Sequence, residues 1–343
     1  MNKSLKVFSL HWQEALLDFC WRSWSALGVP GHRAGHAPSL ADPEALILLT
    51  CAVGRRDPRL FDEMLGWISL HERLINIQRL KTLLVQDSAQ PGPVVAAVAH
   101  FMGRPKSLTK WRRLAQSLSA RQPPEPLFFY ADGRPLPVVG RPDPAFAQAG
   151  LLRDKTTLRN HARSFDPDRP ECLLLKLRAL FGVNSRAEIA AFLVTHEQIN
   201  AAEVARQTGY FQRTAHNTLA EMKLSGLLAV TERGGENLYS LKRAPWACFL
   251  GLPSTPPWIN WPPLLSALAA VWRTTCTPNW AQQTPLQLAL DLHMLFKDIA
   301  PRLQKARLVN HLTAKAGSPD EAFVQASLKD LASLLEVLKA SGR

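Results

Sequence analysis

The sequence predicts a mainly α-helical, multidomain protein with one short β-hairpin near the middle of the chain. Three observations indicate this. Apolar residues recur at steps of three and four over most of the chain, which is the spacing of one helix face. The length of 343 residues exceeds the roughly 100–200 residues of a typical domain. Two short runs of strand-forming residues flank the turn at Gly234 and Gly235, a pattern typical of a hairpin.

Helix-start signals predict an N-terminal helical domain over residues 1–90. Asp42-Pro43-Glu44 and Asp57-Pro58 each combine a capping side chain with a proline at the first helical position. The helix after Asp57 would direct apolar residues from Leu60 to Ile68 toward a core. A further helix, from about 75 to 85, includes the polar run 77–81. This run could instead be the exposed recognition helix of a second helix-turn-helix.

Proline-rich stretches mark changes in organisation. They lie at 90–93, 122–126 and 253–263, and further prolines between 135 and 144 favour an extended path over a helix. We therefore expect four regions. They are the N-terminal helical domain (1–90), a basic linking region with a helix and Pro-rich extended segments (91–183), a central domain (184–250) and a C-terminal helical domain (251–343).

The C-terminal third carries two apolar stripes at helical spacing, which need a surface to pack against. They comprise Leu288, Leu292, Leu295, Ile299 and Leu303, and Val324, Leu328, Leu331, Leu335 and Leu338. They could close a bundle within the chain or form a homodimer interface. The sequence alone does not separate the two.

The charge favours an anionic partner, nucleic acid first. The chain has 41 basic and 28 acidic residues and a net charge of +13, and such an excess attracts polyanions. Residues 101–183 hold 15 basic and 7 acidic side chains, and therefore +8 of the total. Residues 184–250, with 7 basic and 6 acidic side chains, are nearly neutral.

Several function classes are not expected. No apolar run reaches the roughly 18 residues of a membrane span, and the start lacks an apolar signal core, so we expect a cytoplasmic protein. The five cysteines are far apart, which indicates buried free thiols rather than disulfides or a zinc site. Phosphate-loop, nucleophile-elbow and His-Glu-x-x-His motifs are missing. We therefore expect no enzyme, no catalytic residue, no cofactor and no metal.

The most informative segment runs from Ser185 to Lys242. Ser185 and Glu188 have the spacing of a capping box at the start of a helix. A short helix from about 201 to 208 ends at Gly209, and a third helix from 210 to 224 stops at Gly226. The hairpin follows. Helix, helix, turn, helix and hairpin is the order of elements in a winged helix-turn-helix.

The run INAAEVARQTGYFQRTAHNTLAEMKLSGLLAVTERGGENLYSL, residues 199–241, resembles winged-helix transcriptional regulators of the multiple-antibiotic-resistance and arsenical-resistance repressor type. The residues that carry the resemblance are Ala205, Gly209, Leu219, Met222, Gly226, Leu227, Tyr239 and Leu241. The resemblance is confined to this central segment. It implies a DNA-binding domain whose hairpin wing contacts the adjacent minor groove or backbone, here through Arg233.

The third helix is the expected reading element, because a major groove accepts one α-helix and exposes base edges to its N-terminal residues. Arg213 could pair with guanine and Gln212 or Asn217 with adenine, and Thr218 could offer its hydroxyl to phosphates or bases. The residues expected to contact DNA from this helix are Gln212, Arg213, Thr214, His216 and Asn217.

Additional affinity is expected from the basic stretch 104–121, which contains no acidic residue. Lys106, Lys110 and Arg113 are its predicted DNA contacts, since a helical face carrying Lys110 and Arg113 could follow a row of phosphates. A solvated helix face is the alternative. Arg153 and nearby cations up to Arg163 could extend such a patch.

These features predict a sequence-specific, double-stranded DNA-binding transcriptional regulator, acting as a homodimer. A protein-interaction subunit of a DNA-processing or defence complex is the first alternative, because the central domain is nearly neutral; a nucleic-acid enzyme with an unrecognised site is the second. The ten tryptophans could line a pocket for an aromatic or apolar small-molecule effector. Core packing is the other explanation for them.

Overall fold

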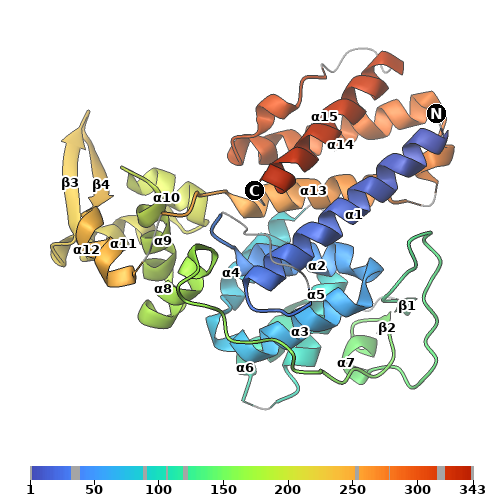
Figure 1. Cartoon of the computed structure of the whole chain (residues 1–343), viewed down its shortest axis with the longest axis horizontal. Coiled ribbons are helices and arrows are strands. Elements are labelled where there is room, and N and C mark those ends of the chain that lie inside the picture. The colour runs from blue at the N-terminus through green and yellow to red at the C-terminus, as the bar shows by residue number, and fades with distance from the viewer. Residues whose placement is uncertain are drawn as a thin grey trace.

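The computed structural model describes residues 2–31, 39–87, 91–105, 107–118, 123–251, 255–277, 279–314 and 321–340. The protein is mainly α-helical, as expected (Figure 1). The helices are α1 (Asn2–Ala26), α2 (Pro43–Val53), α3 (Pro58–His71), α4 (Ile77–Gln86), α5 (Gly92–Met102), α6 (Thr109–Leu118), α7 (Pro144–Ala147), α8 (Leu173–Phe181), α9 (Ser185–Thr195), α10 (Ala201–Thr208), α11 (Gln212–Leu224), α12 (Arg243–Leu250), α13 (Trp261–Thr275), α14 (Pro285–Lys305) and α15 (Glu321–Ala340).

Two small sheets accompany the helices. A parallel pair joins β1 (Glu125–Pro126) to β2 (Leu151–Leu152), and an antiparallel hairpin joins β3 (Leu228–Arg233) to β4 (Glu236–Leu241). Single 3-10 turns are η1 (Gly54–Arg56), η2 (Glu72–Leu74), η3 (Pro170–Cys172), η4 (Trp280–Gln282) and η5 (Val309–His311). Within the described part of the chain, no helix has the length and apolarity that crossing a bilayer requires.

Local capping explains where several helices begin. The Asp42 carboxylate accepts the backbone N–H of Ala45 at 3.0 Å, and Asp57 accepts that of Leu60 at 3.0 Å, so both predicted caps are confirmed. The prediction of a capping box at Ser185 is wrong. Asn184 caps α9 instead, by accepting the N–H of Arg186 at 2.9 Å, because Glu188 is turned into a buried ion network.

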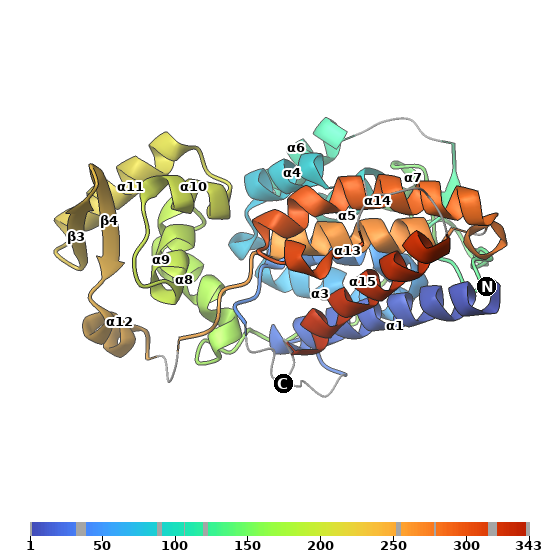
Figure 2. The ribbon, with the colours of Figure 1, turned by 90° about the horizontal axis from the view of Figure 1, so that it is seen from above.

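One large hydrophobic cluster forms the body of the molecule. It draws on the expected regions 1–90, 91–183 and 251–343 together, since α1, α2, α3, α5, α13, α14 and α15 all contribute buried side chains. The views in Figures 1 and 2 show the C-terminal helices lying across α1. The large cluster therefore crosses the boundary expected at 90, whereas the boundary expected at 250 coincides with the end of the second cluster described below.

The two C-terminal stripes pack inside this body. Leu288, Leu292, Ile299 and Leu303 of α14 are completely buried, and the α15 stripe is buried apart from Leu328, which is partly buried. Helix α14 contacts α13 and α15, and α15 contacts α1. Because the chain itself covers these stripes, they close an intramolecular bundle and do not present a homodimer surface.

Most tryptophans lie in the same core. Trp12, Trp24 and Trp67 are fully buried, and each donates its indole N–H within the chain, Trp24 to the hydroxyl of Thr50 at 2.9 Å. Trp261 donates to the carbonyl oxygen of Leu40 at 2.8 Å. Such bonds satisfy the polar end of a buried indole. These four tryptophans serve core packing.

The cysteines follow the prediction except at one position. Cys20, Cys51 and Cys172 are buried free thiols and Cys276 is half-buried, but Cys248 is exposed. Burial raises the pKa of Cys20 to about 12, so this thiol is unreactive at neutral pH. Cys248 differs because α12 lies at the outer edge of the structure and turns one face to solvent (Figure 2).

A second hydrophobic cluster unites α8 to α12 with the hairpin, and we call residues 173–250 the hairpin unit. Ile189 and Phe192 of α9, Val204 of α10 and Leu219 of α11 are buried at its centre. An isolated bridge pairs Ile199 with Tyr239, so a third short extended segment lies beside the hairpin. Figure 1 shows this unit projecting to one side of the body.

Candidate nucleic-acid interface

The turn between α10 and α11 depends on Gly209. Asn200 caps α10 by accepting the N–H of Glu203 at 2.8 Å. Gly209 ends this helix in the left-handed region, with φ of +80°, and donates its N–H to the carbonyl oxygen of Ala205 at 3.0 Å. A side chain rarely adopts this conformation. Glycine therefore lets the chain reverse within three residues before α11 begins at Gln212.

Helix α11 has a buried and an open face. Ala215 and Leu219 are fully buried against the centre of the unit. Thr218 is also buried, and its hydroxyl hydrogen-bonds that of Ser185 at 2.9 Å. The expectation that Thr218 could contact DNA is therefore wrong, because the helix turns this side chain inward.

The open face carries the predicted reading side chains, and Thr214 lies half-buried at its edge. None of them makes a hydrogen bond or ion pair with any residue that the structure describes. The fully exposed members are Gln212, Arg213, His216 and Asn217. Their polar groups are consequently open to an external partner.

The hairpin places a cation at its tip. Strands β3 and β4 pair from Leu228 opposite Leu241 to Arg233 opposite Glu236. Gly234 and Gly235 both have positive φ, +60° and +79°, as a two-residue turn of this hand requires. Arg233 is exposed, whereas the Glu236 carboxylate accepts a hydrogen bond from the Asn200 side chain at 2.8 Å.

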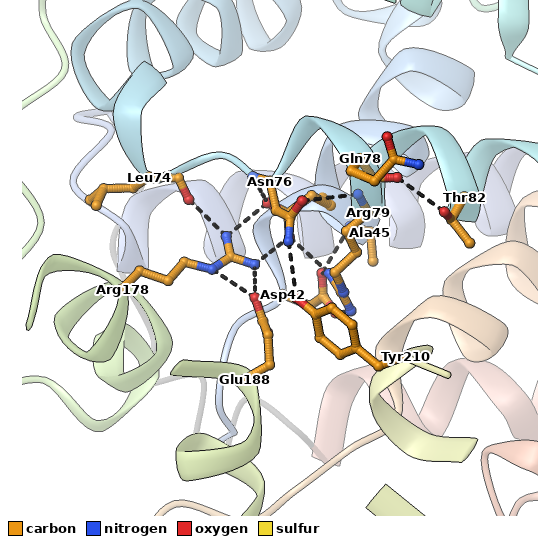
Figure 3. A network of polar contacts seen from close by, with 11 residues as sticks. Asp42, Ala45, Leu74, Asn76, Gln78, Arg79, Thr82, Arg178, Glu188 and Tyr210 are labelled. Carbon is orange, nitrogen blue, oxygen red and sulfur yellow. Dashed lines mark hydrogen bonds and ion pairs between the residues drawn. The ribbon is translucent and has the colours of Figure 1, made fainter. Parts of the chain in front are cut away.

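A buried ion network holds the hairpin unit against the body (Figure 3). Arg178 of α8 is fully buried and donates to Glu44 of α2 at 2.7 and 2.8 Å and to Glu188 of α9 at 2.5 and 2.9 Å. Arg79 of α4 donates to Asp42 at 2.7 and 2.5 Å and to Glu44 at 2.8 Å. The network therefore joins α2 and α4 to α8 and α9.

The network also reaches the start of the reading helix. The side-chain amide of Asn76 donates to the hydroxyl of Tyr210 at 3.3 Å, and Figure 3 shows Tyr210 directed at Asn76 from the hairpin unit. Burial, together with the Glu188 carboxylate, raises the pKa of Tyr210 to about 12. The hydroxyl therefore stays protonated at neutral pH. This contact fixes the residue two positions before α11.

The charges of the network explain its titration. Three carboxylates, Asp42, Glu44 and Glu188, face two guanidinium groups. Burial raises the pKa of Glu188, and the nearby Glu44 carboxylate raises it further. Arg178 and Arg79 lower this pKa, but by less, so it stays above its ordinary value. Burial also raises the pKa of Asp42, but the charge and hydrogen bonds of Arg79 bring it below its ordinary value. The network is thus held by paired charges, fully buried at Arg178 and Glu44 and nearly so at Arg79 and Asp42.

The basic stretch of α6 lies on the body, away from α11 and the hairpin in both views (Figures 1 and 2). Lys110 forms an ion pair with Glu72 at 3.1 Å and donates to the carbonyl oxygen of the same residue. This lysine is therefore not a free phosphate contact. Arg113 is exposed, and Lys106 lies outside the described residues. Nothing brings α6 together with the open face of α11.

Other cations suggested by the sequence are also engaged. Arg104 pairs with the buried carboxylate of Asp143, and Arg153 makes two bonds to Asp62 at 2.7 and 3.1 Å. Arg79, in the polar run 77–81, belongs to the buried network. The second recognition helix proposed for that run is therefore wrong, because its arginine is not available to DNA.

The sequence reasoning missed two features of this region. Arg178 stands in a leucine-rich stretch, and a charged residue at an apolar helix position was the one signal that could have revealed the network. The second feature is an apolar groove of about 550 Å³ behind α11, lined by Phe181, Met222, Leu227, Trp246 and Phe249 among others. Its residues come from α8, α9, α11 and α12, a juxtaposition that sequence order does not reveal.

Comparison of the chain with protein-family models, curated proteins and solved structures finds no match. Among the described residues, no group of three or more histidine, cysteine, aspartate or glutamate side chains lies close enough together to hold a metal ion. The open face of α11 and the hairpin tip present exposed polar and cationic side chains that could form hydrogen bonds and charge contacts with an external partner.

Proposed function

We propose that the protein is a sequence-specific, double-stranded DNA-binding regulator of transcription, whose residues 185–242 form a winged helix-turn-helix. The observation that carries the proposal is the open face of α11. Four side chains on this face are exposed and have no partner among the described residues: Gln212, Arg213, His216 and Asn217. Amide and guanidinium groups that are free in this way are the groups that read base edges.

The arrangement around α11 supports the same use. A recognition helix enters the major groove with its N-terminal residues first, and all four of these side chains lie in the first half of α11. Arg233, at the tip of the hairpin, would contact the backbone or the minor groove beside it. Acting as a homodimer, the protein would read two half-sites about one helical turn apart.

The test compares base preference in matched variants. The wild-type protein selects duplexes from a random library, and the enriched sequence is titrated by fluorescence anisotropy with wild type and Arg213→Ala. We expect Arg213→Ala to bind the enriched duplex more weakly by about 1–3 kcal/mol and to discriminate less at one base position. Arg186→Ala is the control, because Arg186 is exposed in the same unit but pairs with Glu221 at 2.5 Å. Equal affinity and preference for Arg213→Ala and wild type would contradict the groove-reading assignment.

A protein-interaction subunit of a DNA-processing or defence complex is the second candidate. The apolar groove of about 550 Å³ on the hairpin unit favours it, since exposed apolar surface is typical of protein interfaces. Phe249, on its edge, is 61% exposed. A stable heteromeric partner that is retained at high salt, with no selection of duplexes from the library, would support this candidate over the first.

A further inference from the structure

A cleft of about 480 Å³ separates the hairpin unit from the body. One wall is the last turn of α10, residues 206–209, and the opposite walls are the end of α4, the start of α13 and the end of α14. Figure 2 shows α10 on the side of the hairpin unit that faces α13 and α14. The volume lies within the roughly 300–1,000 Å³ of small-molecule sites.

The floor of the cleft is apolar. Leu48 and Leu49 of α2 and Leu265 of α13 line it and are at most 4% exposed. Pro262, Pro263 and Pro301 add further apolar surface. A flat or branched hydrocarbon group could lie on this floor and remove the still accessible surface of the three prolines from water, since burial of apolar surface favours small-ligand binding.

The rim of the cleft is cationic. Five basic side chains line it, Arg79, Arg206, Lys297, Arg302 and Lys305, against two acidic ones, Asp87 and Asp298.

Neighbouring carboxylates already pair with the three arginines of the rim: Arg79 with Asp42 and Glu44, Arg206 with Glu203 and Arg302 with Asp298. Lys297 and Lys305 are exposed on α14 and have no ion-pair partner in the part of the chain that the structure describes. The rim thus holds two lysine charges without an ion-pair partner among the described residues, about two helical turns apart, and one further carboxylate, Asp87, which accepts a hydrogen bond from the Ser266 hydroxyl at 3.0 Å.

The start of α13 adds to this positive potential. The 15-residue helix begins at the cleft, and its N-cap residue, Asn260, makes no side-chain capping bond. The Asn260 amide instead donates to the carbonyl oxygen of Lys305 at 3.3 Å. The aligned peptide dipoles give this helix end a partial positive charge that favours anions. Pro262 and Pro263 have no N–H, and Trp261 donates its N–H to the carbonyl oxygen of Ile259 at 2.9 Å, so these three residues contribute no free backbone donor.

We infer that this cleft binds a small amphipathic anion, with its apolar part on the leucine floor and its acidic group near Lys297, Lys305 and the start of α13. Such a ligand would contact α10 and the body at once and would restrain their relative position. Because α10 leads directly into α11, occupation of the cleft would be linked to duplex binding. This last link rests on the proposed function, whereas the binding site itself does not.

The experiment uses the full-length protein and two fluorescent probes of similar shape. The anionic probe is 8-anilinonaphthalene-1-sulfonate, and the uncharged probe is N-phenyl-1-naphthylamine. Each is titrated into the wild type, into Lys297→Glu/Lys305→Glu, and into Lys329→Glu. Lys329 is an exposed lysine of α15 outside the cleft, and it is therefore the matched control for charge reversal.

We expect the double variant to bind the sulfonate about tenfold more weakly, because two attractive charges become repulsive at short range. The uncharged probe should bind both proteins equally, and Lys329→Glu should match the wild type with both probes. Equal affinity of the double variant and the wild type for the sulfonate would overturn the inference. So would a double variant that loses affinity for both probes to the same extent.

A second measurement separates this inference from the proposed function. The duplex selected by the wild type is titrated with and without saturating sulfonate probe. A shift in duplex affinity that Lys297→Glu/Lys305→Glu abolishes supports the linkage. Sulfonate binding that depends on the two lysines, in a protein that selects no duplex, would support the cleft and contradict the DNA-binding proposal.

Discussion

At the scale of single residues, losing one partner of a buried ion pair costs more stability than losing one partner of an exposed pair. Arg178 has no exposed side-chain surface, and four of its hydrogen bonds go to Glu44 and Glu188. A buried charge without a partner is costly, whereas an exposed pair contributes little because water and salt screen it. The attachment of the hairpin unit therefore depends strongly on one arginine.

We expect Arg178→Met to lower the free energy of unfolding by about 3–5 kcal/mol, because it leaves the buried Glu188 carboxylate without its cation and leaves Glu44 paired with Arg79 alone. Urea denaturation followed by circular dichroism measures this. Arg186→Ala, which removes an exposed pair with Glu221, should cost no more than about 1 kcal/mol. Similar losses in the two variants would show that the network does not stabilise the fold.

Asp143 gives the protein an acid-sensitive contact. Burial raises its pKa, but the Arg104 guanidinium and the backbone N–H groups of Thr156 and Ala145, each at 3.0 Å, bring it below the ordinary value of 3.8. A lowered pKa in the folded state stabilises the fold above pH 3.8 and loses this effect as the pH falls through the folded value. Between about pH 5 and about pH 3, Asp143→Asn should therefore lose less stability than the wild type. Parallel urea-unfolding curves at the two pH values test this, and identical pH dependence in both proteins would refute it.

At the scale of elements, the turn before α11 depends on backbone conformation alone. A Cβ at Gly209 would meet no atom within 4 Å, yet its φ is +80°. Gly66, inside α3, also has open space for a Cβ but lies in an ordinary helix. The two glycines consequently separate backbone strain from steric crowding.

We expect Gly209→Ala to lower the free energy of unfolding by about 1–2 kcal/mol, the cost of a left-handed conformation for a residue with a side chain. Gly66→Ala should raise it by about 0.5–1 kcal/mol, since alanine favours a helix interior. Thermal and urea unfolding of the two variants provide the measurement. A stabilising effect at Gly209 would mean that the turn does not need the left-handed conformation.

At the scale of the whole molecule, the net charge of +13 is not gathered at the candidate interface. Arg213, Lys223 and Arg233 are the exposed cations of α11 and the hairpin, whereas the basic helix α6 lies on the body (Figure 1). Several other basic residues are engaged in ion pairs within the chain, such as Arg153 with Asp62.

This distribution predicts a shallow salt dependence. With Arg213 on a base edge and about two phosphate contacts per chain, from Lys223 and Arg233, the slope of log K against log salt should lie near −2 per chain. Arg113→Ala, on α6, should leave the slope unchanged, and Arg233→Ala should reduce it by about one. Anisotropy titrations at several potassium chloride concentrations measure both. If Arg113→Ala also reduced the slope, α6 would contact the DNA, which contradicts this prediction.

Much of the fold could be predicted from local patterns. The caps at Asp42 and Asp57, the turn at Gly209 and the Gly234-Gly235 hairpin depend on neighbours within a few residues, and all four are present. The capping box at Ser185 failed for the opposite reason. Glu188 is drawn to Arg178 and away from its own helix end, a tertiary contact that overrides the local pattern.

The sequence by itself determined the helical class of the chain, the starts of α2 and α3, the span of α10, the hairpin and the polar character of one face of α11, because these follow from local propensity and periodicity. Only the tertiary structure decided that the C-terminal stripes close the body, that Lys110 and Arg79 are engaged by carboxylates, and that a cationic cleft lies beside α10. Each of these depends on contacts between residues far apart in the chain. Burial and ion pairing are set by those tertiary contacts and not by the local sequence.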